Sequence, residues 1–136
     1  MQKAYGFDTL QLHAGWRGDP ATGAHTVPLY QTSAYLFESA EDAAAQFTGE
    51  VPGSIYTRIA NPTVAILEER VRALENGQAT VCFASGMAAL LALVLTLCEP
   101  GDEIVALSSL YGGSYALLFD QLEHRYGVVA KRVDPE

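Results

Sequence analysis

From Ala79 onward the sequence alternates short β-prone segments with longer helix-prone segments, and this alternation limits the possible folds most strongly. The pattern predicts strands over residues 79–84, 103–107 and 128–133, separated by helices over 87–98 and 114–126. A β-α-β-α-β order predicts an α/β fold with a mostly parallel sheet flanked by helices. Ligands of such sheets bind at the carboxyl ends of the strands, so the two strand-to-helix turns are candidate sites.

The first of these turns is Ser85-Gly86, between the strand expected at 79–84 and the apolar helix that follows. A small residue and a glycine at the start of a helix leave backbone N–H groups free, and the helix dipole favours an anion such as phosphate there. The alternative is an ordinary strand-to-helix turn in which Gly86 only relieves crowding.

The second turn, residues 109–113, contains Tyr111 before two glycines. The tyrosine ring could lie flat on a planar ligand, and its hydroxyl could take part in proton transfer. The alternative is an aromatic side chain that closes the core. Because both turns open on the same edge of the predicted sheet, their convergence favours a ligand site.

A third candidate is the Tyr56-Thr57-Arg58 segment, in a loop flanked by glycine and proline. If the segment is extended, both the phenol and the guanidinium point the same way, a pairing suited to a phosphate. The alternative is that Arg58 pairs with a surface carboxylate.

The part of the sequence before Ala79 is less regular. Residues 1–27 are rich in turn signals and predict an irregular arm that lies on another surface, and residues 28–37 are β-prone. Ser39 is the expected cap of a brief helix that ends at Gly49. Asn61 and Pro62 are expected to open an amphipathic helix that stops at Asn76-Gly77.

Charge and composition narrow the function classes. The chain has 16 acidic and 8 basic residues, a formal charge of −8, and its basic residues do not cluster, which argues against nucleic acid or an anionic membrane as partner. Neither a signal peptide nor an apolar run long enough to span a bilayer is visible. Cys82 and Cys98 lack metal-ligand spacing, as do His13 and His25, so we expect no metal site and a cytoplasmic protein.

Three motifs together resemble one enzyme family. Residues 56–63 (YTRIANPT), 85–89 (SGMAA) and 110–113 (LYGG) follow the order and spacing of the pyridoxal-phosphate enzymes of cysteine and methionine metabolism (the trans-sulfuration family). Residues 7–15 and 27–32 are most similar to the O-acetylhomoserine sulfhydrylase branch. The resemblance covers nearly the whole chain, and it implies the large domain of a fold-type I transferase, here incomplete.

The resemblance also implies roles for individual residues. Gly86 and Met87 would bind the phosphate of pyridoxal 5'-phosphate through backbone N–H groups, and Tyr111 would stack on the ring and assist proton transfer. Tyr56 and Arg58 would bind the phosphate of a neighbouring subunit, in a tetramer built from dimers. Residues 1–62 would then form an arm and loop segment that contacts the neighbouring subunit, and residues 63–136 the first part of the cofactor-binding domain.

The implied reaction is γ-replacement on O-acetylhomoserine with sulfide or a thiol, giving homocysteine or methionine. A methionine γ-lyase or cystathionine γ-synthase activity is the alternative, and a truncated, non-catalytic module is a third interpretation. The family requires a lysine that holds the cofactor as a Schiff base, but Lys3 and Lys131 are the only lysines and neither matches the family's motif. We therefore expect this chain to be the N-terminal portion of a longer enzyme and to be inactive alone.

Overall fold

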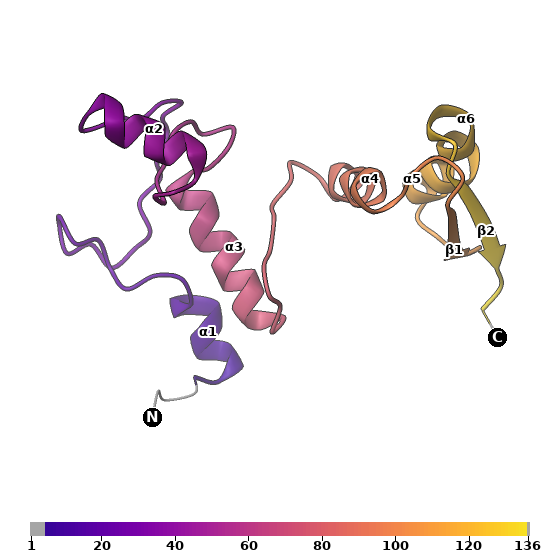
Figure 1. Cartoon of the computed structure of the whole chain (residues 1–136). Helices are drawn as coiled ribbons and strands as arrows, with labels where there is room; N and C mark the ends of the chain where they lie inside the picture. The colour runs from indigo at the N-terminus through magenta and orange to yellow at the C-terminus, as the bar shows by residue number, and fades with distance from the viewer. Residues whose placement is uncertain (1–4, 136) are drawn as a thin grey trace. The chain divides into compact units, whose positions relative to one another are not determined.

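The computed structural model describes residues 5–135, which form two compact units, one ending at Cys82 and the other beginning at Phe83 (Figure 1). The first unit contains helices α1 (Phe7–His13), α2 (Ala40–Thr48) and α3 (Pro62–Leu74). The second contains α4 (Gly86–Leu97), β1 (Glu103–Leu107), α5 (Gly112–Tyr115), the π-helix η1 (Ala116–Gln121), α6 (Leu122–Tyr126) and β2 (Val129–Val133).

Helices α2 and α3 begin and end where capping chemistry predicts. The Ser39 side chain accepts a hydrogen bond from the backbone N–H of Asp42, and Gly49 ends α2 in the left-handed conformation with φ 76°. The Asn61 side chain caps α3 by accepting from Thr63 N–H, with Pro62 in the first turn. After α3, Asn76 adopts φ 52°, so the predicted stop at Asn76-Gly77 is confirmed.

The prediction of an irregular arm over residues 1–27 is wrong for residues 7–13, which form α1. This helix lies against α3, and the Arg70 Nε atom donates to the carbonyl oxygen of Ala14 just after α1, at 3.2 Å. Seven residues span about two turns, so too few apolar positions repeat for a helical period to be visible in the sequence. Tertiary contact with α3 stabilises a helix too short to form alone.

Two predicted β segments are also absent as strands. Within residues 28–37 only Ala34 makes a bridge, an antiparallel one with Tyr56. Residues 79–84 are β-prone but form no ladder with any described strand. The backbone N–H of Cys82 instead donates to a carboxylate oxygen of Glu68 on α3, at 2.8 Å. β-propensity therefore describes this segment, but strand structure requires a neighbouring strand to pair with.

The predicted parallel pairing in the second unit is confirmed. Strand β1 pairs with β2 in parallel register, from Glu103 opposite Val129 to Leu107 opposite Val133. Ile104 and Ala106 of β1 pack against the core, whereas Val105 and Leu107 on the opposite face are exposed. The core itself consists of buried aliphatic side chains from α4, η1, α6 and the residue just before β2: Val94, Leu117, Leu118, Leu122 and Val128.

The predicted helix near 114–126 is continuous in the structure but changes type along its length, from α5 through η1 to α6. Leu117 and Leu122 lie five residues apart and are both buried. A π-helix repeats side-chain directions at about this interval, so η1 turns both leucines toward the core. Arg132 of β2 packs over the rings of Tyr115 and Phe119, with its guanidinium carbon 4.8 and 4.7 Å from the two centroids.

Candidate functional site

The first turn of α4 presents unpaired backbone donors. The Ser85 hydroxyl accepts from Ala88 N–H at 3.1 Å, and its carbonyl accepts from Ala89 N–H at 3.0 Å. The N–H groups of Gly86 and Met87 donate to no acceptor within residues 5–135. A Cβ built on Gly86 would meet no atom within 4 Å, so this end of the twelve-residue helix is open to an incoming anion.

Tyr111 lies beside this turn. Its side chain is 75% exposed, so it does not close the core of the second unit. A Cβ built on Gly113 would lie 2.7 Å from Cε1 of Tyr111 and 3.3 Å from the sulfur of Met87, which shows how closely both approach the glycine. The Ser114 hydroxyl also donates to the Met87 sulfur, at 3.7 Å. The second unit thus brings Met87 and Tyr111 together, around Gly113 and Ser114, to which the sequence pattern assigned no role of their own.

Tyr56 and Arg58 lie in the first unit, where residues 57–59 form a turn, so the condition that the segment be extended is not met. The N–H of Ile59 donates to the Tyr56 carbonyl at 2.8 Å, which closes the turn. Both side chains are exposed, and Arg58 forms no ion pair with any of residues 5–135, so the pairing with a surface carboxylate is not found there. The turn thus presents an exposed phenol and an exposed guanidinium.

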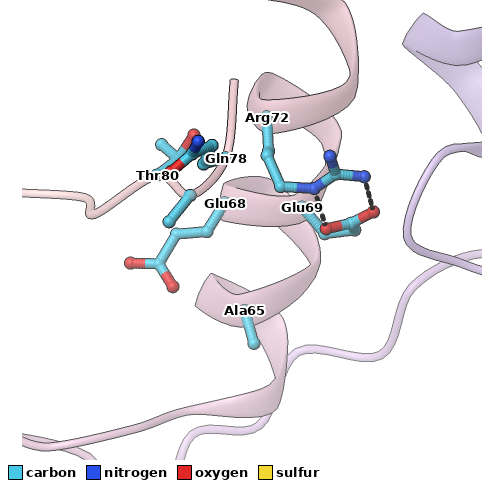
Figure 2. A pocket seen from close by; sticks show the side chains of 7 residues that line it. Ala65, Glu68, Glu69, Arg72, Gln78 and Thr80 are labelled. Carbon is cyan, nitrogen blue, oxygen red and sulfur yellow. Dashed lines mark hydrogen bonds and ion pairs between the residues drawn. The ribbon is translucent and has the colours of Figure 1, made fainter. Parts of the chain in front are cut away.

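A cavity of about 310 Å³ lies along α3, lined by Ala65, Glu68, Glu69, Arg72, Gln78, Ala79 and Thr80. Figure 2 shows the Arg72–Glu69 pair on the helix and the segment of Gln78 and Thr80 beside it. Hydrogen bonding to Arg72 lowers the pKa of the Glu69 carboxyl, and the carboxylate raises the pKa of Arg72. Arg72 also donates to the Gly77 carbonyl at 3.2 Å, so these charges fix the chain after α3.

The structure also shows the surroundings of His13, His25 and Lys131, which the sequence analysis considered as candidate ligands or as a cofactor lysine. The rings of His13 and His25 lie edge to face with centroids 5.6 Å apart, and Trp16 Nε1 donates to the His25 carbonyl at 2.6 Å. No group of three or more metal-ligating side chains occurs among residues 5–135.

Lys131 pairs with Glu103 across the sheet at 2.6 Å, and Lys3 lies outside the described residues. Within the described part of the chain, no helix has both the length and the apolar character needed to cross a membrane.

The family model for Cys/Met metabolism PLP-dependent enzymes matches residues 8–136. The chain belongs to this family. It is 48% identical over 122 residues to the O-succinylhomoserine sulfhydrylase of Pseudomonas aeruginosa, covering 90% of this chain and 30% of that protein. It is 47% identical over 132 residues to the L-methionine gamma-lyase of Pseudomonas deceptionensis, covering 97% of this chain and 33% of that protein.

Solved structures of this PLP-dependent family have the same fold. A crystal structure of a Campylobacter jejuni protein, described as an O-acetylhomoserine (thiol)-lyase, matches with a TM-score of 0.89 and 34% identity. The match covers 96% of this chain and 32% of that one, which carries N'-pyridoxyl-lysine-5'-monophosphate at its position 205. The family match and this structural match confirm the family that the sequence motifs indicated and the predicted fold class, that of fold-type I enzymes. The chain spans about a third of the length of the curated relatives it matches.

The residues of this member of the Cys/Met metabolism family fit the family's cofactor. The N–H groups of Gly86 and Met87, which have no acceptor within residues 5–135, suit a phosphate, and the space where a Gly86 side chain would lie is open. The exposed ring of Tyr111 offers a flat surface next to the same turn. Arg58 and Tyr56 provide a second set of groups suited to phosphate, in the other unit.

Proposed function

We propose that this chain provides part of the pyridoxal-phosphate site of an enzyme that performs γ-replacement on O-acetylhomoserine. Sulfide or a thiol would replace acetate, giving homocysteine or methionine. The observation that carries the proposal is the open first turn of α4 with Tyr111 beside Met87. Family membership and the similarity to sulfhydrylases support it.

Each residue has a distinct part in this proposal. Gly86 and Met87 donate backbone N–H groups to the phosphate and fix the position of the cofactor. The Tyr111 ring stacks on the pyridine ring, and its hydroxyl moves a proton while the γ-substituent leaves. Pyridoxal phosphate supplies the electron sink when bound, and the protein orients it.

Tyr56 and Arg58 would bind the same phosphate, in the site of a neighbouring subunit of a homodimer. Their location on an exposed turn, without an ion pair among residues 5–135, leaves both side chains available to a ligand. In a two-fold dimer such a contact occurs twice, equivalently. The family's tetramers would be built from two of these dimers.

The similarity to a methionine gamma-lyase over 132 residues favours a second candidate, degradation of methionine by the same site. The similar Pseudomonas aeruginosa protein is named for O-succinylhomoserine. Whether the leaving group is acetate or succinate therefore needs a direct test. The full-length gene product should be assayed with O-acetylhomoserine, O-succinylhomoserine and methionine, each with and without sulfide.

The proposal requires the highest kcat/KM with O-acetylhomoserine plus sulfide. Preference for the succinyl ester, or efficient methionine degradation without sulfide, would replace it with the corresponding alternative. No turnover of any of these substrates by a cofactor-loaded protein would favour a non-catalytic module.

A further inference from the structure

Asn61 is the buried polar residue of the described chain, with 7% of its surface exposed. Its side-chain oxygen accepts from Thr63 N–H at 2.9 Å, which is the cap of α3. Capping uses only the oxygen, and an exposed residue can do it equally well. The burial of Asn61 therefore has another explanation.

The Asn61 nitrogen donates to three acceptors from two other segments. These are the Tyr30 carbonyl at 2.9 Å, the Thr57 hydroxyl at 3.1 Å and the Tyr35 hydroxyl at 3.3 Å. A side-chain amide has two N–H groups, so at least one N–H is shared between two of the three acceptors. The nitrogen thus joins the turn that carries Tyr56 and Arg58 to residues 30–35.

Further hydrogen bonds reinforce the same junction. The Thr57 hydroxyl donates to the Thr32 carbonyl, and Thr57 N–H donates to the Ser33 carbonyl at 2.9 Å. The Thr63 hydroxyl, close to Asn61 at the start of α3, donates to the Pro28 carbonyl and accepts from Tyr30 N–H. These bonds hold the backbone on either side of the turn, whereas the side chains of Tyr56 and Arg58 remain exposed.

We propose that Asn61 is a positioning residue that locks the 56–58 turn, so that Tyr56 and Arg58 are held ready for a phosphate before it binds. The inference rests on the proposed phosphate role of Arg58. Preorganisation increases affinity because the turn loses little conformational freedom on binding. Asn61 itself would touch neither cofactor nor substrate.

The test compares Asn61→Asp with Asn76→Asp in the full-length gene product. Aspartate keeps the oxygen that caps α3 but loses the donors. Asn76 is exposed, and its replacement makes the same change of charge on a turn away from the network. Because Asn61→Asp adds a charge near the turn, Thr57→Val is a second, neutral variant, paired with Thr96→Val, whose hydroxyl bonds only within α4.

Two readouts are needed. Hydrogen exchange of residues 56–60 in the apoenzyme should become about tenfold faster in Asn61→Asp and Thr57→Val, while the interior of α3 and both controls exchange as in wild type. The dissociation constant of pyridoxal phosphate for the apoenzyme should rise by about tenfold in the same two variants. Neither effect follows from a role in capping alone.

The outcomes separate this inference from the proposed function. Unchanged exchange at 56–60 in both variants overturns the lock, and so does faster exchange without any loss of cofactor affinity. Arg58→Ala is measured alongside them. If it binds pyridoxal phosphate as tightly as wild type, the phosphate role of Arg58 is wrong, and with it the positioning role that depends on it.

Discussion

Gly113 allows the Tyr111 ring to lie where a side chain at that position would collide with it. The backbone of Gly113 has no requirement for positive φ, so the constraint is space alone. Alanine would place its Cβ 2.7 Å from the ring carbon Cε1, too close for van der Waals contact. Gly112, one residue earlier, has no atom within 4 Å of the same built Cβ. The neighbouring glycines therefore form a matched pair for a test.

Gly113→Ala is expected to move the Tyr111 ring and so to weaken both pyridoxal-phosphate binding and turnover. A misplaced catalytic group of this kind costs about 10²-fold in rate. Gly112→Ala should leave both near wild type, since the added methyl group has room. Titration of the apoenzyme and steady-state kinetics measure the two effects, and equal behaviour of the two variants would contradict the steric argument.

Tyr111→Phe separates the ring of Tyr111 from its hydroxyl. The phenyl ring still stacks, so cofactor affinity should be retained, whereas kcat should fall by about 10²–10⁴-fold with the loss of an acid–base group. Tyr111→Ala should lower cofactor affinity as well. Wild-type turnover in Tyr111→Phe would leave Tyr111 as a stacking platform only.

At the scale of elements, α3 organises the first unit through charges on its surface. Glu68 holds the N–H of Cys82, and Arg72 joins Glu69 to the Gly77 carbonyl. The Glu69 pKa is lowered in the folded state, so its ionised form favours folding. That contribution is complete above the ordinary pKa of 4.5 and disappears as the pH falls through the lower, folded-state value.

We therefore expect Glu69→Gln to lower the Tm slightly at neutral pH and to have no effect in acid. The effect is small because both side chains are partly exposed. Thermal melts of Glu69→Gln and wild type, from neutral pH to pH values below 4.5, test this. The control is Glu75→Gln, which removes an exposed carboxylate that has no ion pair within residues 5–135 and should not lower the Tm at neutral pH.

The elements that could be predicted from sequence are those specified by local chemistry. Asn61-Pro62 begins α3 and Gly49 ends α2, because caps act within a few residues. The parallel order of β1 and β2 follows from their spacing around a helix. α1, the unpaired 79–84 segment and the π-helix η1 could not be predicted, because each depends on contacts with residues far along the chain. The Asn61 network was missed for the same reason.

At the scale of the whole molecule, the proposed action of Arg58 across a subunit interface can be tested by complementation. Arg58→Ala and a variant lacking the cofactor-binding lysine should each be inactive or nearly so in the full-length protein. In a mixed dimer, one site would contain both intact groups and the other neither. Random exchange makes about half of the dimers mixed, so activity should return to roughly a quarter of wild type.

If Arg58 serves its own subunit, every site of a mixed dimer still lacks one group and mixing restores nothing. Native mass spectrometry must show that subunits have exchanged. Mixing Arg58→Ala with wild type provides the reference for the activity of an exchanged population.

The parallel pairing of β1 with β2 has a consequence for synthesis on the ribosome. β1 cannot acquire its partner until Val133, the last residue of β2, has been translated and has left the exit tunnel. At about 5–20 residues per second, the stretch from Glu103 to Val133 takes roughly 2–6 s to make. During that interval the β1 segment of the nascent chain is without its β2 partner, so the backbone groups on that edge of β1 remain unpaired.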